Sequence, residues 1–305
     1  NFFFSIHFAA TLYINSSFLG HFFSPSTVGW LYLLGALGNV YFLLNAERML
    51  SYLGSKGFLL FFSVATLVST IGAALATTPS MAIISFIVYA SVSMMIYYSF
   101  DILLEEISKD ENTGKTRGIY LTITNAAIMG GPILIAFAGD QNNFRDLYLL
   151  SVYFLIPIFL LMIFSLKARR GVEVYLPVSL PFSVWKELKN VRRVTIARTV
   201  LELFFAVMVI YMPIYLHNFI GFSWEQIGII FTFMLLPFVL FEWPAGELAD
   251  KKYGEKEIMF SGFVILCLSV LIMPYLGSSM LIWAIALFVS RIGASLIEIT
   301  TDSYF

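Results

Sequence analysis

Long apolar stretches separated by short polar connections follow one another along the whole chain. Ten of them, at about 3–22, 28–46, 57–77, 80–104, 118–139, 147–166, 196–218, 226–245, 257–276 and 279–305, have the length of a membrane-spanning helix. A helix of roughly 20 apolar residues crosses a hydrocarbon layer of about 30 Å, and it satisfies its backbone hydrogen bonds internally. The pattern therefore predicts an all-α integral membrane protein with ten spans.

Composition supports this class and excludes several others. The chain of 305 residues is 59% hydrophobic and only 12% charged, with a mean hydropathy of +0.87, whereas soluble domains carry about 25% charged residues. Cys267 is the only cysteine, which excludes an internal disulfide and a cysteine-based metal site. No phosphate-binding loop of the G-x-x-x-x-G-K-[ST] type occurs, and the three histidines are scattered. We expect no cofactor, no metal, no nucleic-acid partner and no enzymatic activity.

The basic residues are distributed unevenly between the connections. Of the 18 Lys and Arg residues, all except Arg145 and Arg291 fall in the connections after the even-numbered spans or at their edges. Basic connections stay in the cytoplasm. We therefore expect a multi-pass protein of the cell (plasma or inner) membrane, with the N-terminus and the even connections in the cytoplasm.

The sixth connection divides the chain, and its two sides resemble each other. Residues 169–194 form a long basic linker, which predicts a half at 1–168 and a second half at 195–305. The segment from Ser26 can be aligned with the segment from Glu225 at an offset of about 199 residues, which suggests an internal repeat. The matched pairs are Gly29 with Gly228, Ala46 with Ala245, Gly54 with Gly254 and Lys56 with Lys256.

The connection after the eighth span carries the most specific motif, "GELADKKYGEK". It resembles the cytoplasmic signature Gly-x-Leu-Ala-Asp-Arg/Lys-x-Gly-Arg-Lys of the major facilitator superfamily, with one extra residue before Gly254 and with Glu255 in place of a base. The first-half copy keeps only Gly54 and Lys56. The matching residues are Gly246, Leu248, Ala249, Asp250, Lys251, Gly254 and Lys256.

The resemblance implies a bundle of two six-helix halves, of which this chain contains ten helices, the second half ending after its fourth. It also implies that Gly246, Asp250, Lys251, Gly254 and Lys256 belong to a cytoplasmic gate. A tight basic turn that only sets orientation is the alternative.

Charges within the spans are the best candidates for a solute site, because each costs about 2.5–3.5 kcal/mol to insert. The resemblance implies that spans one, four, seven and ten line a central cavity. Arg291, Glu298 and Glu202 would then contact solute or a coupling ion, and a structural ion pair between helices is an equal alternative for Arg291. Asn15 and Asn125 are further polar candidates. Asp101, Glu105, Arg117 and Asp302, near the inner ends of their spans, are expected to form pairs beside the gate.

These expectations combine into one function. The chain is expected to be a secondary active transporter that moves a small solute by alternating access as a monomer in the bilayer, with proton coupling left open. The alternatives are a sensor or scaffold that keeps the transporter fold without transport and, less favoured, a membrane-embedded enzyme.

Overall fold

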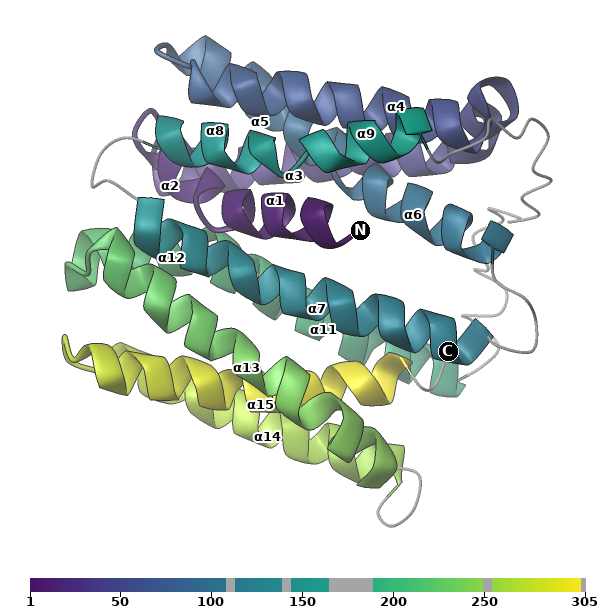
Figure 1. The fold of residues 1–305 in the computed structure, drawn as a ribbon. Coiled ribbons are helices and arrows are strands. Elements are labelled where there is room, and N and C mark those ends of the chain that lie inside the picture. The colour runs from purple at the N-terminus through teal and green to yellow at the C-terminus, as the bar shows by residue number, and fades with distance from the viewer. Residues whose placement is uncertain (108–112, 139–143, 165–188, 249–253, 303–305) are drawn as a thin grey trace. The chain divides into compact units, whose positions relative to one another are not determined.

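A computed structural model describes residues 1–107, 113–138, 144–164, 189–248 and 254–302 (Figure 1). Within these ranges the chain is helical and contains no β-strand. It divides into two compact units, Asn1–Val178 and Ser179–Phe305. Each unit is described separately below.

The first unit contains nine helices within the described ranges. They are α1 (Phe2–Leu12), α2 (Asn15–Gly20), α3 (Pro25–Leu44), α4 (Ala46–Ala74), α5 (Pro79–Val92), α6 (Met94–Ile107), α7 (Thr113–Ala138), α8 (Arg145–Tyr153) and α9 (Ile156–Phe164). The pairs α1/α2, α5/α6 and α8/α9 are interrupted spans, each apolar and long enough to cross a membrane as one unit.

The described part of the second unit consists of four long helical segments. The first consists of α11 (Lys189–Ile210), α12 (Met212–Tyr215) and the π-helix η2 (Leu216–Ile220); the others are α13 (Trp224–Leu248), α14 (Glu255–Ile272) with the 3₁₀ turn η4 (Met273–Tyr275), and α15 (Met280–Asp302). Helix α15 packs against α11, α13 and α14 and is therefore the central helix of the described part of this unit.

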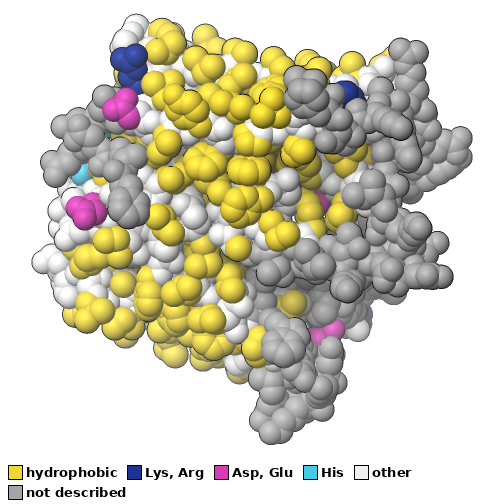
Figure 2. All heavy atoms as spheres, viewed as in Figure 1, with side chains coloured by type: hydrophobic (Ala, Val, Ile, Leu, Met, Phe, Trp, Pro, Cys, Tyr) yellow, Lys and Arg dark blue, Asp and Glu magenta, His cyan; other side chains and the backbone are white. Residues whose placement is uncertain are grey.

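The prediction of a helical membrane protein is confirmed. Nine helices of the described part are long and apolar enough to cross a membrane. The predicted fifth span, 118–139, coincides with α7, whose apolar part is shorter, Ile123–Ala136. Apolar side chains are spread widely over the described part of the face seen in Figure 2, and Trp30, Leu37 and Leu268 are each more than half exposed. Such a surface fits lipid rather than water as its surroundings.

Two helix starts at matched positions of the proposed repeat are capped in the same way. The Ser24 hydroxyl accepts a hydrogen bond from the Thr27 amide at α3, and the Ser223 hydroxyl accepts one from the Gln226 amide at α13. Such caps satisfy backbone donors that the first helical turn leaves unpaired. Ser24 and Ser223 are 199 residues apart, so the equivalent local chemistry supports the repeat.

Two glycines at matched positions of the proposed repeat share an unusual backbone conformation. Gly54 has φ 67° and ψ 167° inside α4, and Gly254 has φ 83° and ψ 155° immediately before α14. This region of backbone space is open essentially only to glycine. In both halves, therefore, glycine makes a sharp break at the start of the helix that corresponds to the third span.

Candidate functional site

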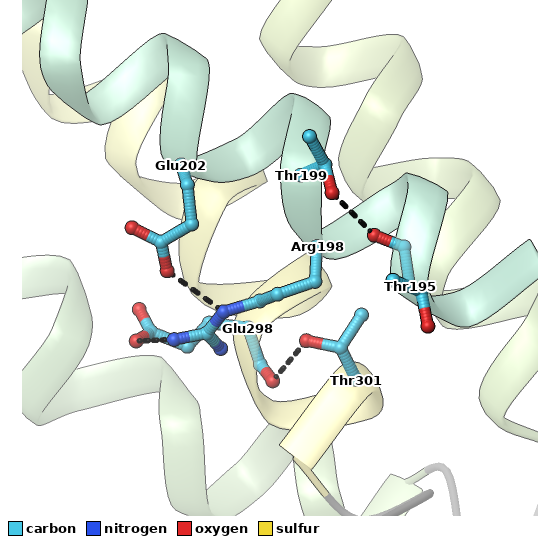
Figure 3. A network of polar contacts seen from close by, with 6 residues as sticks. All are labelled: Thr195, Arg198, Thr199, Glu202, Glu298 and Thr301. Atoms are coloured by element: carbon cyan, nitrogen blue, oxygen red, sulfur yellow. Dashed lines mark hydrogen bonds and ion pairs between the residues drawn. The ribbon is translucent and has the colours of Figure 1, made fainter. Parts of the chain in front are cut away.

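Arg198 connects two helices of the second unit through a small charged network. Its Nε donates to Oε1 of Glu202, one turn further along α11, at 2.8 Å. Its Nη2 donates to Oε1 of Glu298 on α15 at 3.4 Å (Figure 3). The side chains of Arg198, Glu202 and Glu298 are 31%, 54% and 25% exposed. The three side chains are thus only partly buried.

Threonines surround this network but bond to the backbone. Thr199 donates to the Thr195 carbonyl at 2.8 Å, and Thr301 donates to the Glu298 carbonyl at 2.9 Å (Figure 3). These hydroxyls therefore bond to backbone carbonyls of their own helices. The carboxylate of Glu298 on α15 is bound by Arg198 on α11.

Arg291 lies deeper in the same helix pair. It is 2% exposed, and its guanidinium carbon lies 5.0 Å from the centre of the Phe204 ring and 5.4 Å from that of Phe205, both on α11. A guanidinium within about 6 Å of an aromatic face is attracted by the ring. Arg291 follows Met280 by eleven residues, or about 16 Å of helix, which places it near the middle of α15.

The network and Arg291 share one face of α15. Glu298 follows Arg291 by seven residues, nearly two full turns, or roughly 10 Å along the axis. The structure thus brings three predicted site residues, Glu202, Arg291 and Glu298, onto the contact between α11 and α15.

The first unit contains its own set of buried polar side chains, on α1 and at the start of α2. His7 Nδ1 lies 3.1 Å from the Ser151 carbonyl oxygen, Thr11 is bonded to the Tyr89 hydroxyl, and Asn15 accepts from the Tyr148 hydroxyl at 2.7 Å. His7 and Thr11 are four residues apart in α1 and so lie on one face of it, and Asn15 is the first residue of α2. Asn15 is 5% exposed, and its oxygen holds helix α8. Asn125 lies half-buried on α7.

The predicted gate residues are only partly within the described ranges. Gly254 is the N-cap of α14, and Lys256 is exposed in its first turn. Asp101 is exposed on α6. Asp250 and Lys251 lie outside the described residues, as do the side chains of Glu105, Arg117 and Asp302; Gly246 lies in α13, and nothing further is described there.

Comparison with known families favours one of the functional classes left open by the sequence. The family model of the Major Facilitator Superfamily matches residues 1–304. The chain belongs to this superfamily. It is accordingly a multi-pass membrane protein and a secondary transporter of small molecules.

Solved structures agree with the superfamily fold. A mutant of the nucleoside transporter NupG matches with a TM-score of 0.80 at 14% identity, covering 99% of this chain and 80% of that chain. Another NupG crystal structure matches with a TM-score of 0.75 at 14% identity, covering 99% and 79%. Among curated proteins, none matches this sequence.

Three residues on the contact between α11 and α15 are not among those that the sequence singles out. Arg198 resembles the last base of the linker, and Phe204 and Phe205 resemble ordinary packing residues. One signal is present, because Arg198 and Glu202 have the i,i+4 spacing at which opposite charges meet on a helix. No sequence signal pairs Arg198 with Glu298, which is 100 residues away.

Proposed function

We propose that the transporter works by alternating access, with Arg291 as a solute contact and Arg198, Glu202 and Glu298 as a charge network that responds to protons. The observation that carries the proposal is the placing of all four charges on the contact between α11 and α15. Charged groups within a membrane segment mark solute or ion pathways by default.

The division of roles follows from depth and burial. Arg291 lies near the middle of α15 and is almost completely buried; a planar guanidinium there can bind a carboxylate, a phosphate or a carbonyl group in a directional way. Glu298 is nearer the C-terminal end of α15 and a quarter exposed. Protonation of its carboxylate would weaken the bond from Arg198 and free that guanidinium to pair with Glu202 alone.

A nucleoside is the first solute to test. NupG, whose fold this chain shares, is a nucleoside transporter. An identity of 14% supports a shared fold but not a shared solute. Nucleosides are therefore tested in a panel that also contains sugars, amino acids and organic anions. We further propose a monomer in the cell membrane with its basic connections in the cytoplasm, and transport rather than catalysis.

The test is solute flux into liposomes that contain the full-length protein, with and without a proton gradient. Arg291→Ala is expected to abolish flux of the transported solute, and Arg291→Lys to retain a small part. Glu298→Gln is expected to keep exchange of solute while removing the response to the gradient. Unchanged flux in Arg291→Ala would refute the assigned solute contact. A protein that binds solutes from the panel without moving any of them would be the sensor or scaffold alternative.

A further inference from the structure

Three buried polar atoms in the first unit have no hydrogen-bond partner within the part of the chain that the structure describes. They are Nε2 of His7 on α1, the hydroxyl oxygen of Ser16 on α2 and the hydroxyl oxygen of Tyr32 on α3. His7 and Ser16 are each 0% exposed. A buried polar group without a partner is costly, and most such groups in folded proteins are paired with protein or with bound water. These atoms therefore indicate a ligand that forms hydrogen bonds with them.

The imidazole of His7 is fixed by its neighbours. Nδ1 lies 3.1 Å from the backbone carbonyl oxygen of Ser151, and since a carbonyl only accepts, Nδ1 carries the hydrogen. The ring also lies against the rings of Phe4 and Tyr89. A charged imidazole among such neighbours would be costly, so Nε2 carries a lone pair. This atom therefore requires a hydrogen-bond donor.

The hydroxyl of Tyr89 on α5 provides a second acceptor, one helical turn from His7. Thr11 donates to the carbonyls of His7 and Phe8 at 3.1 and 2.9 Å, so the Tyr89 hydroxyl is the donor in its hydrogen bond with Thr11. The Tyr89 oxygen keeps its capacity to accept. The ring centroids of His7 and Tyr89 are 6.0 Å apart. A molecule of the size of water, with two donors, matches these two acceptors.

The hydroxyls of Ser16 and Tyr32 lie near each other without a direct hydrogen bond. Helix α2 packs against α3 and α5, and the Tyr32 hydroxyl lies within electrostatic reach of Ser16 and of Tyr89. Neither the Ser16 nor the Tyr32 hydroxyl has a hydrogen-bond partner among the described residues. Polar atoms that are neighbours but lie beyond direct hydrogen-bonding distance are commonly bridged by water.

We propose that the interior of the first unit binds ordered water. One water molecule donates to Nε2 of His7 and to the oxygen of Tyr89, and another bridges the hydroxyls of Ser16 and Tyr32. The four side chains are neutral and include both donors and acceptors, which suits a small uncharged ligand that can donate and accept. The site lies in the first unit, whereas the proposed charge network lies in the second, so neither proposal depends on the other.

X-ray radiolysis of the full-length protein in detergent tests the proposal, because hydroxyl radicals formed from bound water oxidise the side chains beside it. Mass spectrometry compares Tyr32 and Tyr89 with Phe58 and Phe62, which are 0% exposed and belong to an apolar cluster. The two tyrosines are expected to be oxidised about fivefold faster or more. Oxidation of the tyrosines as slow as that of the two phenylalanines would overturn the proposal.

A matched pair of serine variants tests the bridge between Ser16 and Tyr32. Ser16→Ala removes one partner of the water and is expected to slow the oxidation of Tyr32 about threefold. Ser99→Ala is the control, because Ser99 is 2% exposed but its hydroxyl already donates to the Met95 carbonyl at 2.7 Å. The control is expected to leave the oxidation of Tyr32 unchanged. Equal slowing in the two variants would overturn the proposed bridge.

A second measurement on the unaltered protein covers any loss of folding in the variants. A high-resolution crystal or cryo-EM map is expected to show a separate density peak about 2.7–3.2 Å from Nε2 of His7. A protein side chain bonded to Nε2 in its place would overturn the proposal.

Discussion

Arg198 binds two carboxylates, that of Glu202 on its own helix and that of Glu298 on α15. Its guanidinium has a fork of donors, so two partners can be bound at once. All three side chains are partly exposed, and an exposed ion pair contributes only about 0–1 kcal/mol to stability. The network is therefore suited to changing partners during a transport cycle and poorly suited to holding the fold together.

A double-mutant cycle measures how much the ion pair between Arg198 and Glu298 contributes to stability. Arg198→Gln and Glu298→Gln are expected to couple by about 0.5 kcal/mol or less in the free energy of unfolding, because water screens the pair. The measurement is denaturant or thermal unfolding of the purified protein in one detergent. Glu202→Gln serves as the control within the helix. A coupling energy above about 2 kcal/mol would mean a desolvated structural pair and would count against a switching role.

At the scale of single helices, two glycines in matched positions give a prediction about the backbone. Gly254→Ala and Gly54→Ala are each expected to lower stability by about 1–3 kcal/mol, because alanine is strained at their positive φ angles. Gly277→Ala is the control, since that glycine has no positive φ and its added Cβ would meet nothing within 4 Å. Unfolding midpoints of the three variants provide the test. If Gly254→Ala behaved like Gly277→Ala, the break before α14 could not depend on glycine.

The contact between α1 and α7 gives a second prediction at this scale. A Cβ added at Gly131 would lie 2.5 Å from the Ala9 carbonyl carbon, whereas one added at Gly130 would come no closer than 3.8 Å to Ile6. Gly131→Ala is expected to cost about 1–3 kcal/mol by forcing the helices apart, and its neighbour Gly130→Ala to cost much less. Thermal unfolding compares them directly. Equal costs would show that α1 and α7 do not approach each other at Gly131.

Helices such as α4 and α15 could be predicted from the sequence because a long apolar run has few alternatives in a membrane. The superfamily followed from the motif after the eighth span together with the order of spans, the basic linker and the repeat, and both predictions are confirmed. For the candidate site, the sequence predicted single residues but not which of them contact one another. Glu298 stood out as a charge in an apolar run, but its partner Arg198 did not, because Arg198 follows a basic linker. Which side chains meet across α11 and α15 depends on helix packing, which a one-dimensional pattern does not contain.

At the scale of the whole molecule, the two units carry a repeat with unequal charge. Ser24 and Ser223 cap equivalent helices, and Gly54 and Gly254 break equivalent segments. The first-half motif lacks an acidic residue at the position that matches Asp250. We therefore expect a gate built on the repeat to act unequally in the two halves, with a charge change in the second half disturbing transport more.

The orientation of the whole chain is the last prediction, and the single cysteine makes it testable. With Cys267→Ser as background, Asp146→Cys and Lys189→Cys each place one thiol at an exposed helix start. The asymmetry of Lys and Arg predicts that residue 146 faces outward and residue 189 faces the cytoplasm. In intact cells a membrane-impermeant maleimide should label only Asp146→Cys, and after permeabilisation it should label both, which controls for reactivity. Labelling of Lys189→Cys alone in intact cells would invert the topology and place the gate motif outside.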